Sequence, residues 1–170
     1  MEDRAIVAGQ LGRAPRAFRR VAARCPYGLP AVTEQAPYDR RGDPFPTTYY
    51  VTCPHLVSAI ARLEAAGGVE RWSTAAASDD ALGASLERAG VEQRRVRREL
   101  AGNELGSDDG MSLGLGIGGS HSQKHLKCLH AHVAFALARP GYELGERILA
   151  EVADPWPTDR CCSERLGAGN

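Results

Sequence analysis

The sequence predicts an α+β fold, in which a small antiparallel three-stranded sheet packs with four to five helices in a single domain. Three observations lead to this prediction. Short β-branched segments separated by turn residues occupy the first third of the chain, and apolar residues recur at helical spacing in the rest. The length of 170 residues suits one domain with its own core. We expect this domain to span residues 1–157 and a polar, disordered tail to follow over residues 158–170.

The first third of the chain is predicted to form a helix followed by an antiparallel meander. Residues 3–11 carry apolar side chains on one helical side, and Gly12 ends that helix. Short turns then separate three segments of strand character, the last of which is the richest in β-branched and aromatic residues. The predicted strands cover residues 17–24, 31–36 and 47–52.

The rest of the chain is predicted to be helical, with glycine and proline marking the helix ends. Gly67 and Gly68 end the first of these helices, and Asp79 begins a longer one with an apolar stripe. A glycine-rich loop at residues 103–119 separates it from the last two helices. The predicted helices cover residues 54–66, 79–100, 122–138 and 143–152.

The charge balance argues against a dedicated nucleic-acid binder, because Lys and Arg total 21, Asp and Glu total 21, and the formal net charge is zero. The arginine-rich face of residues 79–100 is interpreted as a solvated helix face, with docking of RNA or a protein partner as the alternative. No segment is apolar over the thickness of a bilayer, which argues against a membrane protein. The N-terminus lacks signal-peptide features, and five cysteines, an odd number, fit thiols in a reducing cytoplasm.

Two cysteines, Cys25 and Cys53, each end a predicted strand and each precede a proline. Proline fixes the turn, so each sulfur is expected to project from a rigid corner. Cys53 also precedes the helix predicted at residues 54–66, whose amide dipoles favour a thiolate. Both positions therefore suit a metal ligand or a nucleophile.

Ligand-type side chains also recur on the helix predicted at residues 122–138. Steps of about 100° per residue place four of them in one stripe beside the apolar face, where a bound metal would be shielded yet reachable. This stripe comprises His121, His125, Cys128 and His132.

Convergence of these segments would create a Cys₃His set that suits Zn²⁺ or an iron–sulfur cluster. The spacing along the chain is long and irregular, so this hypothesis competes with the interpretation as inert core and turn residues. The predicted ligands are Cys25, Cys53, Cys128 and one histidine, with His132 preferred to His55.

A thiol-dependent enzyme is the alternative function. Cys53 would be the nucleophile and a histidine the base, while backbone amides of the glycine-rich segment 114–119 would bind an anion. That segment matches G-x-G-x-x-G, but it lacks the preceding strand that a dinucleotide site requires, and a tight connection is the alternative. The catalytic candidates are Cys53, His55 and His130, and the candidates for the anion site are Gly116, Gly118, Gly119, Lys124 and Lys127.

Several short motifs occur in an order that resembles one known family. The chain is similar, over about residues 3–153, to the bacterial family called domain of unknown function 501. The motifs are Cys-Pro-Tyr-Gly-Leu-Pro at residues 25–30, Pro-Thr-Thr-Tyr-Tyr-Val-Thr-Cys-Pro-His-Leu at 46–56, Gly-Ile-Gly-Gly at 116–119, Lys-Cys-Leu-His-Ala-His at 127–132 and Pro-Gly-Tyr-Glu-Leu-Gly at 140–145.

The resemblance implies a cytoplasmic protein of a family without an assigned activity. It also implies neighbouring genes for a septum-formation protein and an exopolyphosphatase, an association that suggests phosphate chemistry, with a phosphate-containing ligand, or a role in cell division. The recognised motifs exclude His121 and His125, so the resemblance ranks His132, His130 and His55 above them as ligands. The predicted function is therefore a cytoplasmic metal-binding protein, with a thiol-dependent enzyme or a protein or RNA interaction module as alternatives.

Overall fold

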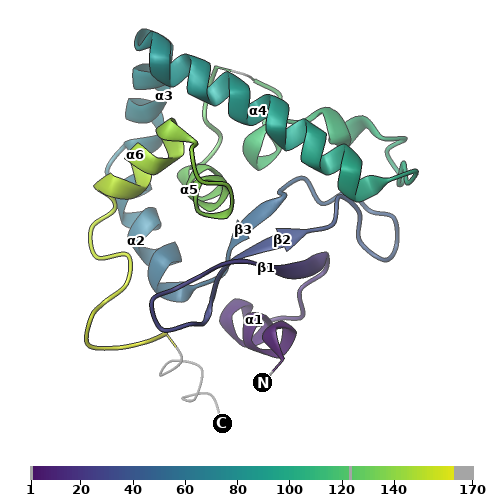
Figure 1. The fold of residues 1–170 in the computed structure, drawn as a ribbon, viewed down its shortest axis with the longest axis horizontal. Coiled ribbons are helices and arrows are strands. Elements are labelled where there is room, and N and C mark those ends of the chain that lie inside the picture. The colour runs from purple at the N-terminus through teal and green to yellow at the C-terminus, as the bar shows by residue number, and fades with distance from the viewer. Residues whose placement is uncertain (1, 123, 163–170) are drawn as a thin grey trace.

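A three-stranded antiparallel sheet lies at the centre of the computed structural model, which describes residues 2–122 and 124–162 (Figure 1). The strands lie side by side in chain order, which confirms the predicted meander. Every residue of the middle strand is buried. The strands are β1 (Phe18–Arg24), β2 (Pro30–Gln35) and β3 (Tyr49–Val51).

Six α-helices and two short 3₁₀ helices complete the described part of the chain, so the predicted α+β class is confirmed. Four of the α-helices agree with the prediction to within two residues at each end. The α-helices are α1 (Asp3–Leu11), α2 (Pro54–Ala65), α3 (Gly68–Ser78), α4 (Asp80–Ala101), α5 (Leu129–Ala138) and α6 (Glu143–Glu151), and the 3₁₀ helices are η1 (Met111–Gly114) and η2 (Ile117–Gly119).

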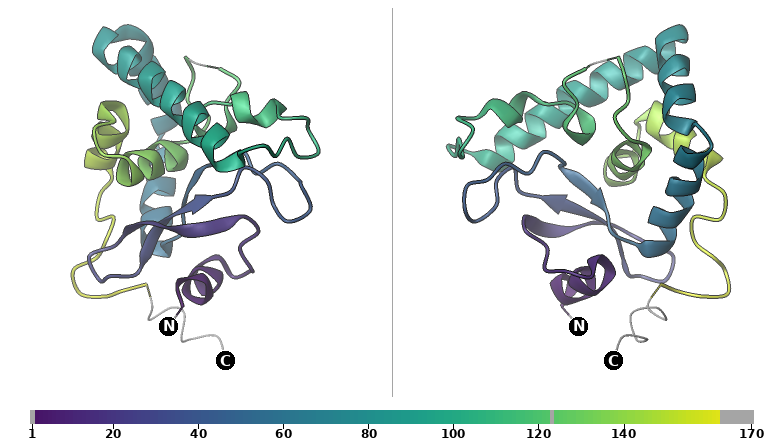
Figure 2. Two further views of the ribbon diagram at one scale, coloured as in Figure 1. Left: turned by 45° about the vertical axis from the view of Figure 1, so that its right-hand side comes forward. Right: turned by 180° about the vertical axis from the view of Figure 1, so that it is seen from behind.

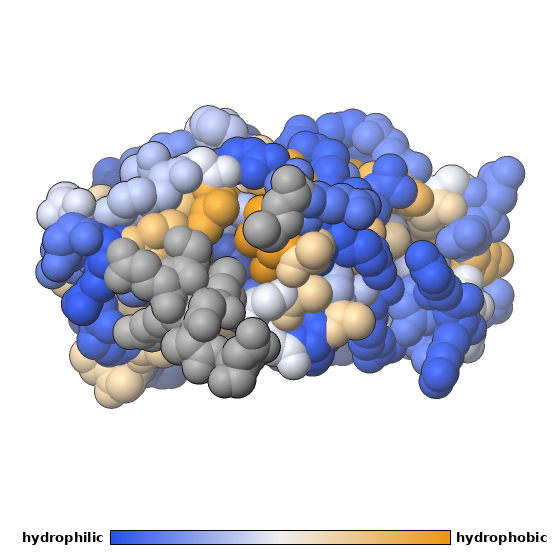
Figure 3. All heavy atoms as spheres, turned by 90° about the horizontal axis from the view of Figure 1, so that it is seen from below, coloured by the Kyte–Doolittle hydropathy of each residue, from blue (hydrophilic) through white to orange (hydrophobic). Residues whose placement is uncertain are grey.

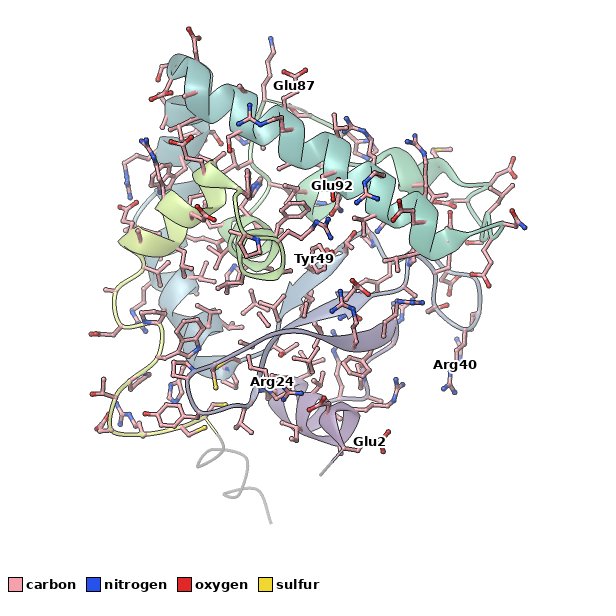
Figure 4. All side chains as sticks on the ribbon, viewed as in Figure 1. Glu2, Arg24, Arg40, Tyr49, Glu87 and Glu92 are labelled. Atoms are coloured by element: carbon pink, nitrogen blue, oxygen red, sulfur yellow. The ribbon has the colours of Figure 1, made fainter. Side chains whose placement is uncertain are left out.

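The sheet is sandwiched between α5 on one face and α1 on the other, as the three ribbon views agree (Figures 1 and 2). Helix α5 is buried around most of its circumference because α2, α6 and η2 also pack against it. Tyr49 of β3 meets Phe135 of α5 edge to face, with ring centroids 5.6 Å apart (Figure 4). Helix α5 is therefore the central element of the core.

The long helix α4 is fastened to the rest of the molecule by Arg97, whose side chain is fully buried. Its guanidinium donates to the carbonyl oxygens of Ser112 at 3.2 Å and Phe45 at 3.0 Å, and to the hydroxyl of Thr48 at 3.4 Å. Burial lowers the pKa of Arg97. Arg97 thus joins α4, η1 and the segment that precedes β3.

The predicted helix at residues 122–138 is wrong in its first half, since α5 begins only at Leu129. Serine side chains take the backbone amides that a helix would need. Ser120 Oγ accepts from the amide of Ser122 at 3.1 Å, and Ser122 Oγ accepts from the amides of Lys124 and His125 at 3.2 Å each. Such local bonds offer the backbone an alternative to the helix.

Helix α3 was not predicted, because the pair Gly67 and Gly68 was interpreted as the end of a helix followed by a connection. Gly67 adopts a left-handed conformation with φ of 84° and ends α2, but the next helix starts directly after it. Two residues, Ala66 and Gly67, therefore make the corner between α2 and α3.

The C-terminal segment returns to the body of the protein instead of leaving it. Cys162 is 1% exposed and belongs to the main core cluster. Residues 163–170 of the expected tail lie outside the described residues. Seen from below, the described surface is mostly hydrophilic, with small apolar areas between hydrophilic ones (Figure 3). None of the described helices combines the length and the apolar character needed to span a membrane.

Candidate functional site

The residues predicted as metal ligands occupy different places in the fold. Cys25 follows β1, Cys53 precedes α2, Cys128 precedes α5 and His132 lies within α5. Within residues 2–122 and 124–162, no three His, Cys, Asp or Glu side chains are grouped so that they could hold a metal ion. The structure therefore does not bring the predicted ligand set together.

The two Cys-Pro corners are formed as expected, but both sulfurs face inward. Cys25 begins a turn in which its amide donates to the carbonyl of Leu29 at 2.9 Å. Cys53 is the N-cap residue of α2, with proline in the first turn. Their side chains are 6% and 1% exposed, so neither thiol meets a substrate in this arrangement.

Cys128 is the N-cap residue of α5, but its side chain makes no capping hydrogen bond. Burial is the main cause of the raised pKa of this thiol, and the carboxylate of Glu64 adds to it. Cys128 is therefore protonated at neutral pH, which does not favour thiol catalysis.

Glu64 of α2 occupies the N-terminus of α5. Its Oε1 accepts from the amide of Leu129 at 2.7 Å and lies 3.1 Å from Nδ1 of His130. The other ring nitrogen of His130 lies 3.2 Å from the carbonyl oxygen of Val57. These contacts join α2 to α5, and they leave His130 without a free nitrogen to serve as a base.

The glycine loop packs against the start of α5, and the anion site expected there stays a prediction. Gly118 has φ of 70°, and a Cβ at this position would lie 3.0 Å from Cβ of Ala131. Glycine is required because the loop approaches the helix so closely. At the helix N-terminus, the amide of Leu129 already donates to Glu64. Gly119 and Lys127 lie near each other, and Lys124 is exposed. Gly116 lines the cavity described next, which the other four residues of the predicted set do not line.

That cavity, here called the histidine pocket, lies between α4, the glycine loop and α5. Its volume is about 60 Å³, several times the roughly 10–15 Å³ that one water needs. The loop after η2 contributes exposed His121 and His125, and α5 contributes buried His132. The remaining polar side chains of the lining belong to Glu87, Arg94, Ser120 and Ser122.

Three of the four residues expected on one helical stripe thus meet in one pocket, although they do not share a helix. The two serine turns described above carry His121 and His125 to the pocket. Cys128, the fourth member of the stripe, does not line it. The sequence spacing selected these histidines because they were expected on one helix face. In the structure they meet because a loop and a helix both border the pocket.

His132 is the buried polar group of the pocket. Its Nδ1 lies 2.8 Å from the hydroxyl of Tyr142, so Nε2 is the ring nitrogen available to a ligand. Burial lowers the pKa of His132 to about 3, and burial also raises the pKa of Tyr142. At neutral pH the pair consists of an uncharged imidazole and a protonated phenol.

Arg94 is the positively charged group of the pocket and was not identified from the sequence, where it was assigned to the solvated face of the helix. Its guanidinium lies over Gly90, one turn earlier, and a Cβ at Gly90 would be 3.4 Å from Nη1. The missing side chain at Gly90 leaves room for Arg94 at the pocket. In the sequence, the glycine four residues before Arg94 is the signal that this arginine has room to lie along the helix at the pocket.

Comparison with known proteins gives a family and nothing beyond it. A family model described as protein of unknown function (DUF501) matches residues 21–150. Searches of curated proteins and of solved structures found no match. The matched segment covers the sheet except the first three residues of β1, together with α2 to α5 and most of α6, and so includes every residue of the histidine pocket.

Proposed function

We propose that this protein, which belongs to the family of proteins of unknown function DUF501, binds a small oxyanion in the histidine pocket. Phosphate and a carboxylate are examples of such an oxyanion. The observation that carries the proposal is the grouping of one arginine and three histidines from three separate segments around a single cavity. Arginine and histidine are the side chains that recognise oxyanions by charge-assisted hydrogen bonds.

Arg94 supplies the fixed positive charge. Among the residues that the structure describes, no carboxylate lies within ion-pair distance of its guanidinium, although Glu87 lines the same pocket. Figure 4 shows Glu87 on the side of α4 that faces away from the sheet. An arginine without a carboxylate partner retains its donors for an anionic ligand.

His132 supplies an uncharged hydrogen-bonding group from the interior. When the hydroxyl of Tyr142 donates to Nδ1, the proton of the imidazole is on Nε2, which then donates toward the pocket. Ser120 and Ser122 add hydroxyl groups at the rim. A ligand with several acceptor oxygens satisfies such a set of donors.

The predicted metal function ranks below this proposal, because Cys25, Cys53, Cys128 and His132 do not form a group of ligands in the described residues. The predicted thiol enzyme also ranks below it. Cys53 is buried, and the pKa of Cys128 is raised. The predicted phosphate-containing ligand is retained, but in a different place from the predicted glycine site.

The test is a titration of the protein with inorganic phosphate, followed by the ring signals of the histidines in two-dimensional NMR. We expect saturable shifts of the signals of His121, His125 and His132, with the signal of His130 unchanged. Parallel titrations with sulfate and acetate distinguish a tetrahedral oxyanion from a carboxylate. Absence of saturable shifts up to tens of millimolar of each anion would contradict the proposal.

Arg94→Gln and Arg95→Gln form a matched pair of variants. Both remove one charge from the same helix, but Arg95 is paired with Glu92 and Glu99 on the surface and does not line the pocket. We expect Arg94→Gln to weaken phosphate binding by about tenfold or more, since hydrogen bonds to charged groups contribute about 1.5–3 kcal/mol. Equal losses in the two variants would indicate a general effect of charge and not a site.

A further inference from the structure

Two thiols that are distant in the sequence meet in the core. Cys53 stands between β3 and α2, and Cys162 lies at the C-terminal end of the described residues. Each is 1% exposed, both belong to the same core cluster, and the two thiols lie close enough to affect each other's ionisation. Gln10 of α1 also donates to the sulfur of Cys162, at 3.7 Å. The contact therefore joins the N-terminal helix, the start of α2 and the end of the chain.

The segment that carries Cys162 is here called the C-terminal strap and comprises residues 152–162. It contains no helix or strand, and it runs from α6 past α2 to the turn between β1 and β2 (Figure 1). The hydroxyl of Tyr27 in that turn donates to the carbonyl of Pro157, and Arg62 donates to the carbonyl of Ala153 at 3.5 Å. A few side chains thus hold an irregular segment against the body.

We propose that Cys53 and Cys162 form a disulfide when the protein meets a peroxide, and that this bond locks the C-terminal strap onto the N-terminus of α2. The proposal is independent of the histidine pocket, which contains neither cysteine. Both thiols are reduced in this structure. Their contact means that the bond requires only small local movements of the two side chains.

The chemistry is a two-electron oxidation of the thiol pair by hydrogen peroxide. Burial and the neighbouring Cys53 raise the pKa of Cys162 to about 12, which assigns the first attack to Cys53. Peroxide reaches the buried Cys53 when the strap, which a few side-chain hydrogen bonds hold, lifts from the body. The Cys53 sulfur then loses its proton and attacks one peroxide oxygen, and the O–O bond breaks. The products are a sulfenic acid and hydroxide, which takes up the proton and becomes water. The Cys162 sulfur then attacks the Cys53 sulfur, the S–O bond breaks, and the second water leaves with the proton of Cys162.

The disulfide would control access to a cavity between α2 and the strap. His55, Ser58 and Arg62 line it on the helix side, while Asp154 and Asp159 line it on the strap side. His55 has a buried Nε2 that has no hydrogen-bond partner among the described residues. Fixing the strap at Cys162 holds this cavity closed around His55, whereas the reduced pair lets the strap open.

The test is treatment of the reduced full-length protein with stoichiometric hydrogen peroxide, followed by peptide mapping without reduction. We expect a Cys53–Cys162 crosslinked peptide that dithiothreitol cleaves, together with a rise of about 10 °C in the melting temperature, as for a disulfide that closes a long loop. Failure to find this peptide, or a link from Cys161 to either of the two cysteines in its place, would overturn the proposal.

Variants separate this pair from general oxidation. Cys162→Ser and Cys53→Ser are each expected to abolish both the crosslink and the rise in melting temperature, while Cys128→Ser retains both. Cys162→Ser is the principal variant, because Cys53 is the N-cap residue of α2 and its replacement tests folding as well. A rise in melting temperature that persists in Cys162→Ser would show that oxidation acts at another site.

Discussion

The buried imidazole of His132 makes the stability of this protein depend on pH in a way that one substitution can isolate. Histidine in an unfolded chain has a pKa of about 6.5. In the folded protein burial lowers the pKa of His132 to about 3. The unfolded state therefore binds a proton in the range between these values and the folded state does not. The contribution of His132 to the free energy of unfolding is therefore fully present above pH 6.5, and it is lost as the pH falls toward 3.

The size of the effect follows from these two pKa values. One unit of difference between pH and the unfolded pKa is worth about 1.4 kcal/mol. Lowering the pH from 7 to 5 should therefore reduce the free energy of unfolding by about 2 kcal/mol through His132 alone. A reduction of this size is a large part of the stability of an ordinary domain.

The assay is urea unfolding at pH 7 and at pH 5 for the wild type and for His132→Gln. The variant is less stable at pH 7, since it loses the hydrogen bond to Tyr142, but it should lose about 2 kcal/mol less than the wild type between the two pH values. His121→Gln serves as the control, because it removes an exposed histidine of the same pocket. Equal pH dependence in the wild type and His132→Gln would refute the argument that this imidazole is buried in its neutral form.

Three substitutions test how the scaffold is held together, each by thermal or urea unfolding. Arg97→Ala should lower stability by about 3 kcal/mol or more, since it leaves buried carbonyl oxygens without a donor and opens a cavity; a loss below 1 kcal/mol would mean that the guanidinium contributes little. Gly145→Ala should cost about 1–3 kcal/mol, because a Cβ there would lie 2.7 Å from the carbonyl oxygen of His132, and unchanged stability would show that α6 can move away from α5. Asp79→Ala should cost about 1 kcal/mol through loss of the α4 N-cap bond to the amide of Leu82, with Asp79→Asn as the control that retains most of it.

The elements that local chemistry specifies were predictable from the sequence. Cys53 followed by Pro54 at the first helical position predicted the start of α2, and Asp79 predicted the start of α4. The β-branched run that ends at Val51 predicted β3. In each case neighbouring residues alone determine where the element begins or ends.

The features that depend on tertiary contacts were not predictable. Residues before Leu129 had helical periodicity, but Ser73 of α3 accepts from the amide of Leu126 at 3.1 Å and holds that segment away from a helix. The meeting of Cys53 and Cys162 depends on the path of the C-terminal strap, which has no periodic pattern. Arg94 resembles its solvated neighbours in the sequence, because only the packing of the glycine loop against α4 makes this arginine line the histidine pocket.

The position of α5 has a consequence for synthesis on the ribosome. The sheet is complete once residue 51 has emerged, but the helix that covers one of its faces is translated much later, at residues 129–138. Until then the inner side chains of the strands, including Tyr49, lack their partners. The nascent chain therefore exposes an apolar sheet face through most of translation, and we expect the cooperative folding step to follow release of the last third of the chain.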